Sequence, residues 1–180
     1  MEKAMRFFFE LELLKEMQRT GWYFIGERDG DSVASHSFRA AFIAHWLARK
    51  VGADPDRCMK MALIHDVGET RVWDINKVSA SYTEKDEERA AKEAMKGVFD
   101  EFEPIYKEMK ARKSKDALVA RDADLLECII QAKTFEMRGN PLAREWIINA
   151  SKGLHFGESK ELASKVGKND KVWWAGLKKL

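Results

Sequence analysis

Two histidines and two aspartates, His36, His65, Asp66 and Asp124, carry the side chains that most readily bind a divalent metal ion. Imidazole nitrogens and carboxylate oxygens that converge from different helices can hold one cation and leave positions for water and substrate. His65 and Asp66 are consecutive, so on a straight helix they point about 100° apart and share an ion only near a helix end. Gly68 predicts such an end, and the four residues together predict a mononuclear metal site.

Each of these residues has a simpler interpretation when it is taken alone. A single histidine in an apolar helix is more often a packed, hydrogen-bonded residue than a ligand, and a lone aspartate is usually solvated. The whole pattern favours the metal, because Asp124 lies amid Ala120, Leu125 and Leu126. A charge that close to an apolar face needs a partner or a metal.

Helices must position these residues, because apolar residues recur mostly at steps of three and four. We expect an all-α fold of about seven helices, with residues 22–25 as the only short strand candidate. The expected helices cover residues 5–14, 32–50, 55–65, 84–102, 104–111, 114–139 and 141–151, with one or two more in the tail. Ser32 or Ser35, Asp54, Thr83 and Ser114 or Asp116 are the expected N-caps, and Gly52 ends the second helix.

Length and composition predict a single domain over residues 1–180 in a cytoplasmic protein. The 180 residues are 45% hydrophobic, enough for one compact core, and the net charge is only +2. Near-balanced charge argues against a generic nucleic-acid partner, and no apolar run reaches a membrane span or forms a signal peptide. Cys58 and Cys128 form no disulfide or metal pattern. Abundant Lys and Glu, with few Asn and Gln, resemble the composition of heat-adapted proteins.

Five short motifs and their order along the chain resemble the HD superfamily of metal-dependent phosphohydrolases. Within that superfamily they are most similar to the branch of small 5'-deoxynucleotidases and HD-domain-containing nucleotidases. The resemblance covers about residues 10–140, and the tail 141–180 carries no motif. It implies an HD-domain helical bundle with additional C-terminal helices, in which His36, His65, Asp66 and Asp124 bind one divalent ion. The matching segments are Arg19-Thr20-Gly21-Trp22, Ser32-Val33-Ala34-Ser35-His36-Ser37, His65-Asp66-Val67-Gly68-Glu69, Asp74-Ile75 and Ala123-Asp124.

The resemblance also implies catalytic roles for Glu69 and Asp74. Glu69 follows Asp66 by three residues, so one helical turn would bring it beside the metal to orient water or move a proton. Asp74 lies in the loop beyond and could serve the leaving 5'-oxygen. The chain departs from its relatives before Asp74, where Trp73 stands in place of a frequent glycine.

Substrate contacts are expected from Arg19 and Trp22. The planar guanidinium of Arg19 suits a phosphate monoester, with an exposed loop arginine as the alternative. Trp22 is expected to stack on the substrate or wall its pocket, with core packing as the alternative. Arg39 and Lys77 are further pocket candidates, although a solvated position is the commoner one for both. His45 is about 180° around the helix from His36 and is interpreted as structural, and His155 stays unassigned.

These residues predict a metal-dependent phosphomonoesterase that hydrolyses a nucleoside 5'-monophosphate, and we expect the substrate to be a deoxynucleotide. The metal is Mn, Co, Fe, Ni, Zn or, less suitably, Mg. The alternatives are a hydrolase of alarmones or cyclic nucleotides, and a non-catalytic HD-fold nucleotide-binding regulator. Large apolar residues in the tail, mostly tryptophans, favour a homodimer, with core packing as the alternative. These tail residues are Trp146, Val172, Trp173 and Trp174.

Overall fold

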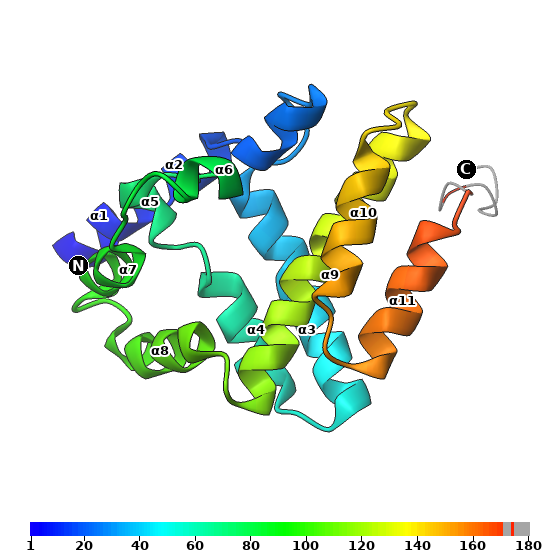
Figure 1. Cartoon of the computed structure of the whole chain (residues 1–180). Coiled ribbons are helices and arrows are strands. Elements are labelled where there is room, and N and C mark those ends of the chain that lie inside the picture. Colours follow the sequence, from blue (N-terminus) through cyan, green and yellow to red (C-terminus); the bar gives the residue numbers. More distant parts are fainter. Residues whose placement is uncertain (171–173, 175–180) are drawn as a thin grey trace.

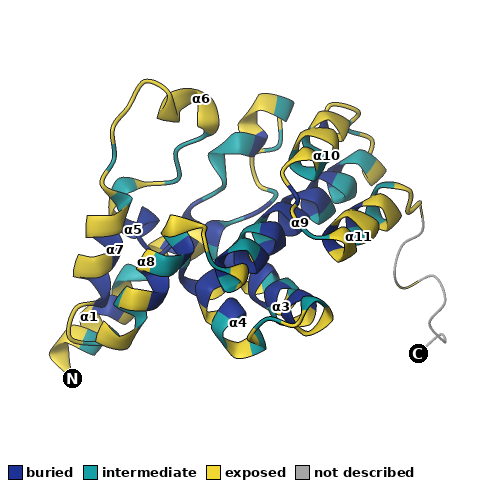
Figure 2. Cartoon of the chain, turned by 60° about the horizontal axis from the view of Figure 1, so that its bottom comes forward, coloured by how far each residue is buried: buried dark blue, intermediate teal, exposed yellow. Residues whose placement is uncertain are grey.

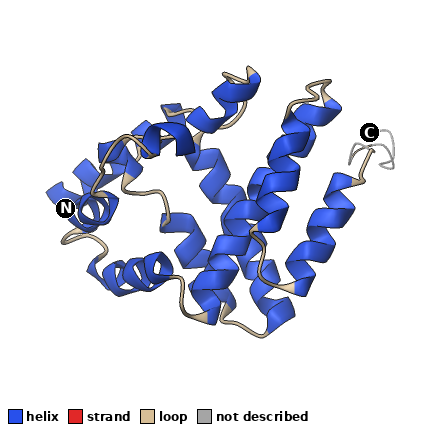
Figure 3. Cartoon of the chain, viewed as in Figure 1, coloured by secondary structure: helices blue, strands red, loops and turns tan. Residues whose placement is uncertain are grey.

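Helices and loops make up the whole of the described chain, residues 1–170 and 174 of a computed structural model (Figure 3). Within these residues the only β-type pairing is one isolated antiparallel bridge, between Gln18 and Ser32. The all-α prediction is therefore confirmed. The elements are α1 (Glu2–Glu10), α2 (Glu12–Glu16), η1 (Thr20–Ile25), α3 (Val33–Val51), α4 (Pro55–Ile64), α5 (Glu69–Val72), α6 (Lys77–Ala80), α7 (Glu87–Met95), η2 (Asp100–Phe102), α8 (Glu103–Ala111), α9 (Lys115–Met137), α10 (Ala143–Lys152) and α11 (Gly157–Gly167).

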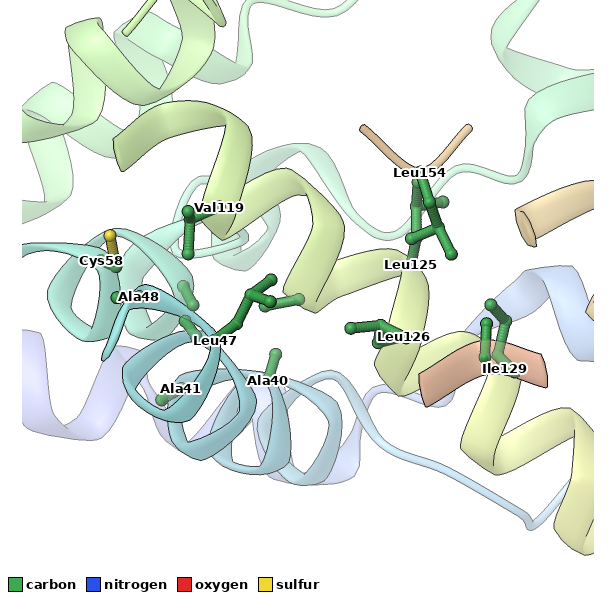
Figure 4. Close-up of a cluster of buried hydrophobic side chains, with 14 residues drawn as sticks. Ala40, Ala41, Leu47, Ala48, Cys58, Val119, Leu125, Leu126, Ile129 and Leu154 are labelled. Atoms are coloured by element: carbon green, nitrogen blue, oxygen red, sulfur yellow. The ribbon is translucent and has the colours of Figure 1, made fainter. Parts of the chain in front are cut away.

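The long helix α9 runs through the middle of the molecule beside α3 and α4 (Figure 1). α3 turns small residues toward it, since Ala40, Ala44 and Ala48 lie one turn apart and are fully buried. Side chains without branches let the two helix axes approach closely, and larger residues of α9, such as Leu126 and Ile129, fill the remaining space (Figure 4). This packing fixes the positions of α3 and α9, the two helices that carry His36 and Asp124.

The other helices lie on either side of this centre. α1, α7 and α8 cover one side, and α10 and α11 cover the other (Figure 1). Buried residues concentrate along α9 and the inner sides of α3 and α4, whereas α6 is exposed or half-buried throughout (Figure 2). No helix in residues 1–170 combines the length and apolarity that a membrane crossing requires.

Most of the predicted helix ends are confirmed. Ser32 accepts a hydrogen bond from the Ser35 backbone and forms a reciprocal capping box with it. Asp54 caps α4 ahead of Pro55, and Ser114 caps α9. Gly52 ends α3 with φ +70°, a conformation that glycine adopts without a Cβ clash.

Several local predictions are wrong. Residues 22–25 belong to the 3-10 helix η1 rather than to a strand. The predicted long helix 84–102 begins later, with Asp86 rather than Thr83 as its cap, and ends at Met95 before Gly97 at φ +75°. Residues 1–170 contain eleven α-helices rather than about seven, because loops divide the chain into short helices that periodicity alone does not separate.

Candidate metal centre and substrate cleft

The four predicted metal ligands converge at one point from α3, the end of α4 and α9. His36 lies in the first turns of α3, and His65 is the residue at which α4 ends, so its neighbour Asp66 is free to turn toward the same point. The Nε2 atoms of His36 and His65 are 3.1 Å apart. Asp66 Oδ2 lies 3.1 Å from His65 Nε2, and Asp124 Oδ1 lies 3.3 Å from His36 Nε2.

Both imidazoles present a lone pair to this point. His36 Nδ1 donates to the carboxylate of Glu127, and His65 Nδ1 donates to the backbone carbonyl of Ala62 at 2.7 Å. A carboxylate and a carbonyl only accept hydrogen bonds, so in each neutral ring the proton resides on Nδ1. The two Nε2 atoms therefore face each other as acceptors, which is unfavourable unless a cation or an added proton lies between them.

This donor set fits a divalent metal ion. Two nitrogens bound to one ion at about 2.1 Å and at right angles are about 3.0 Å apart, close to the distance between the two Nε2 atoms. Two carboxylates at the same point supply the negative charge that balances the cation. Mixed nitrogen and oxygen ligation suits Mn, Co, Fe, Ni and Zn better than Mg.

The electrostatics of the cluster favour a cation in the same way. Burial lowers the pKa of His36, but Glu127 and Asp124 outweigh burial and raise that pKa to about 9. Burial opposes ionisation of Asp66 and Asp124, yet the pKa of each lies below its ordinary value. The cause for Asp66 is mainly His65, and for Asp124 mainly the hydrogen bond with His36. The pocket therefore draws positive charge onto its ligands.

A second layer behind His36 was not predicted from the sequence. Glu127 is fully buried, and besides His36 it accepts hydrogen bonds from Arg39, whose Nε lies 2.9 Å from Glu127 Oε1. Arg39 also donates to Gln131 Oε1 at 2.7 Å. A carboxylate that holds the far nitrogen of a ligand histidine fixes its ring and its tautomer. The one feature of the sequence that could have indicated Glu127 is its spacing. It follows Asp124 by three residues, so the two lie on the same side of a helix that buries few polar residues.

Arg19 lies beside the metal ligands. Its Nη1 is 3.5 Å from Asp66 Oδ2, and its Nη2 donates to Cys128 Sγ at 3.5 Å. The 3-10 helix η1 starts at the next residue, so the side chain projects from the end of an ordered loop. The structure therefore brings a guanidinium to the edge of the cation site, where it can meet a phosphate.

Glu69 lies near enough to Asp66 and Asp74 to feel their charges, but neither it nor Asp74 forms a hydrogen bond or ion pair with the four predicted ligands. Glu69 is 6% exposed, and its Oε2 has no hydrogen-bond partner among the described residues. Burial, together with the charges of Asp66 and Asp74, raises the pKa of Glu69 to about 10. Asp74 accepts a hydrogen bond from the backbone N–H of Thr20, which ties the loop after α5 to the residue next to Arg19.

The loop that carries Asp74 has an unusual backbone. Trp73 adopts φ +66°, in the region that favours glycine, and its side chain is exposed. Close packing also constrains the turn before α5, because a Cβ on Gly68 would come within 2.5 Å of the Glu87 carbonyl oxygen. Trp73 thus holds, at some cost in strain, a backbone conformation that a glycine would adopt freely.

A cleft of about 330 Å³ opens beside the cluster. Arg19, Lys77 and Arg121 line it together with Asp124, and Arg19 and Arg121 pair with Asp66 and Asp124 of the cluster. Trp22 is 3% exposed and does not line the cleft, and its ring packs against Trp146 and Phe135. Further lining residues are Phe24, Val78, Leu125, Cys128, Glu145, Trp146, Asn149 and Ala150.

The two remaining histidines lie outside the site. His45 Nδ1 is 3.7 Å from Asp56 Oδ1, away from the cluster, as its helical spacing predicted. His155 donates through its backbone N–H and its Nδ1 to Asp122, a fully buried carboxylate on α9. Asp122 also accepts from the backbone of Phe156, so this group anchors the start of α11.

Comparison with known proteins identifies the class that this fold and site define. The profile of the HD domain family matches residues 11–154. The chain therefore belongs to the HD domain family.

Particular relatives extend this assignment. The zebrafish (Danio rerio) protein named 5'-deoxynucleotidase HDDC2 is 28% identical over 168 residues, which are 88% of this chain and 83% of that protein. The Dictyostelium discoideum protein of the same name is 31% identical over 79% of this chain and 82% of its own. The crystal structure of the PH0347 protein from Pyrococcus horikoshii OT3 superposes with a TM-score of 0.75 at 31% identity. It covers 91% of this chain and 98% of that one.

Proposed function

We propose that this protein is a metal-dependent 5'-nucleotidase, which hydrolyses (deoxy)nucleoside 5'-monophosphates to a nucleoside and phosphate. The observation that carries the proposal is the pair of imidazole lone pairs 3.1 Å apart, flanked by two carboxylates beside a cation-lined cleft. Relatives named 5'-deoxynucleotidase support the choice of a nucleotide as the substrate. The reaction forms a bond from phosphorus to a water oxygen and breaks the bond to the 5'-oxygen, which takes up a proton.

His36, His65, Asp66 and Asp124 would hold the divalent ion. When bound, the ion supplies Lewis acidity that activates water and stabilises charge on the phosphoryl group. Glu127 holds the ring of His36 in place through Nδ1, so the ligand geometry is preorganised. Which of the suitable metals is native is decided by metal analysis of the purified protein.

The remaining residues bind the phosphate and move protons. Arg19 offers two N–H donors to phosphate oxygens beside the ligands. Glu69 is placed to orient water or carry a proton, because it is buried one helical turn from Asp66 with an unpartnered oxygen. Asp74, held by Thr20, serves the proton of the leaving 5'-oxygen. Trp22 acts on the substrate through Trp146, against which it packs.

A panel of mono-, di- and cyclic nucleotides against a panel of divalent metals, scored by released product, tests this function. We expect phosphate release from deoxynucleoside 5'-monophosphates that depends on an added metal such as Mn²⁺ or Co²⁺. Cleavage of only cyclic nucleotides or alarmones would overturn the proposed substrate. Thermal stabilisation by nucleotide with no turnover under any metal would instead favour the regulator.

We also propose that the protein forms a homodimer. Phe38, Phe42 and Trp46 lie one turn apart on the outer face of α3 and are 64%, 62% and 42% exposed. Phe38 shares an apolar groove of about 360 Å³ with Phe8 and Leu63, both more than half exposed. We call these five residues the aromatic stripe.

The area of the aromatic stripe suits a second copy of the chain. A large aromatic side chain can bury about 150–250 Å² of surface. About half exposure of the four aromatic side chains and Leu63 therefore leaves roughly 500 Å² of apolar surface, a fitting centre for an interface of about 800 Å² per partner. An antiparallel pairing about a twofold axis would set Phe42 against its own copy. The predicted tail residues Val172 and Trp173 lie outside the described residues.

We further propose that residues 1–180 act as one catalytic unit in the cytoplasm. The support for one unit is that α10, beyond the motif-bearing part, lines the same cleft as Arg19. The support for the compartment is that Cys58 and Cys128 are both free thiols.

A further inference from the structure

Two kinds of side chain line the cleft. Arg19 and Arg121 each pair with one of the predicted metal ligands, Asp66 and Asp124, so charge gathers around that cluster. α10 contributes Trp146, Asn149 and Ala150, so the lining also includes an indole, an amide and a methyl group. A ligand that fills the cleft therefore needs an anionic end and a flat, largely apolar end with polar edges.

Trp146 is held rigidly enough to act as a wall. Its ring lies 4.7 Å from that of Trp22, centroid to centroid, and Trp22 is buried against Phe135. A Cβ on Gly21 would come within 2.8 Å of Trp146 Cη2, so the absence of that Cβ lets the indole pack onto η1. Because η1 begins directly after Arg19, the same short segment places both the phosphate-binding guanidinium and the indole.

We infer that α10 forms the nucleoside subsite of the cleft, with Trp146 as the stacking surface for the base and Asn149 as a reader of its edge. This inference rests on the proposed nucleotidase function and adds which residues hold the nucleoside. Every base offers a flat π-face, and stacking on tryptophan stabilises it with little dependence on its identity. Asn149 adds an amide with two donors and an acceptor, and its Oδ1 already accepts from Lys152 at 3.0 Å.

Charge supports this orientation of the nucleotide. Glu145 lies on α10 beside Trp146 and lines the same cleft, so a phosphate placed there would meet a carboxylate. Arg19 and Arg121, which pair with Asp66 and Asp124, instead favour the phosphate beside the predicted metal ligands. The base is then left to the part of the cleft that α10 lines.

The test compares two substrates that differ only in the base. 2'-Deoxyadenosine 5'-monophosphate and 2-deoxyribose 5-phosphate are assayed with the Mn²⁺-loaded wild type, Trp146→Ala, Trp146→Phe and Asn149→Ala. We expect Trp146→Ala to lower kcat/KM for the nucleotide about tenfold more than for the sugar phosphate, mainly through KM. Trp146→Phe, which keeps an aromatic face, should restore most of the difference. Phe9→Ala removes an aromatic side chain exposed on α1 outside the cleft and serves as the matched control.

Calorimetric binding of 2'-deoxyadenosine, which has no phosphate, separates this inference from the function on which it rests. Binding to the wild type that is weakened about tenfold in Trp146→Ala supports the subsite even if no nucleotide is hydrolysed. Equal losses for both substrates in Trp146→Ala, with no rescue by Trp146→Phe, would show a purely structural role and overturn the inference. Unchanged nucleotide KM and unchanged nucleoside binding in Trp146→Ala would overturn it as well.

Discussion

The two faces of α3 reverse the usual distribution of polar and apolar side chains. The inner face buries the imidazole of His36 completely, while the outer face exposes Phe38 and Phe42 by more than 60% each. The alanines of the inner face, Ala40, Ala44 and Ala48, let α9 pack closely against α3. Burial on this helix therefore does not follow the hydrophobicity of individual residues.

Each departure has its own physical explanation. A buried imidazole is costly unless its nitrogens are satisfied, and here Glu127 holds one nitrogen while the ligand cluster takes the other. Exposed phenylalanines lose the free energy of burial unless another surface covers them. A cation would stabilise the inner face, and a second protein surface would stabilise the outer face. Because the two faces are separate, a change at one should leave the other intact.

The largest expected effect comes from Asp66, the predicted ligand after α4 that meets His36 of the inner face. Asp66→Asn keeps the side-chain shape but removes its negative charge, so we expect loss of bound metal and about a thousandfold or greater loss of phosphatase activity. Metal content of the purified variant and its turnover of 2'-deoxyadenosine 5'-monophosphate measure this. Asp56→Asn, at an exposed aspartate, is the control. Full activity with bound metal in Asp66→Asn would refute the ligand assignment.

The layer behind the ligands should have a smaller effect. Glu127→Gln leaves His36 without its carboxylate partner, so we expect metal affinity to fall about 10- to 100-fold. Competition with a fluorescent chelator measures the dissociation constant without reference to activity. Glu136→Gln changes a glutamate on the same helix that pairs with Lys133 and should leave the affinity unchanged. If Glu127→Gln binds the metal as tightly as the wild type does, Glu127 does not position His36 for metal binding.

The pH dependence of metal binding should follow His36. Without metal, its pKa of about 9 exceeds the usual 6.5, so its contribution to native stability is complete below about pH 6.5 and is lost as pH rises to 9. Glu69 acts in the same direction, because its pKa of about 10 keeps it protonated when folded while the unfolded carboxyl ionises. The metal must displace the proton of His36, so its apparent affinity should rise up to about tenfold per pH unit across this window.

Melting temperatures with and without Mn²⁺ from pH 6.5 to 9 measure that dependence. We expect the melting temperature of the metal-free protein to fall with pH and the stabilisation by Mn²⁺ to grow. His45→Ala, which removes a histidine outside the cluster, should show the same trend. A stabilisation by Mn²⁺ that is equal at both ends of the range would contradict the assignment.

The outer face gives the smallest effect on the chemistry of each protomer. Phe42→Glu places a charge at the centre of the aromatic stripe, and we expect dimer affinity to fall about thirtyfold, the usual effect of losing an interface hot spot. Sedimentation equilibrium measures the change. Tyr82→Glu, at a tyrosine that is 86% exposed in the loop after α6, is the control. A wild type that stays monomeric at high micromolar concentration would overturn the proposed homodimer.

Sequence reasoning found the four side chains that the fold brings together, but not the residues that hold them. His36, His65, Asp66 and Asp124 could be found because their chemistry is rare at such spacing and because the order of motifs resembled a known family. Glu127 and Arg39 could not be paired, because they are 88 residues apart and meet only when α3 packs on α9. Trp22 was expected to wall the substrate, yet Trp146 lines the cleft and Trp22 lies behind it.

The sequence by itself determined the helical class, most helix caps and the four residues able to bind a metal. These follow from local periodicity, capping chemistry and side-chain type, which depend on neighbours within a few residues. Tertiary packing alone decided which face of α3 is buried, which tryptophan reaches the cleft and which carboxylate holds His36. Apolar residues occur all round α3, so periodicity could not choose its inner face. The packing of the alanines against α9 determines which face is buried, and His36 is buried because it lies on that face.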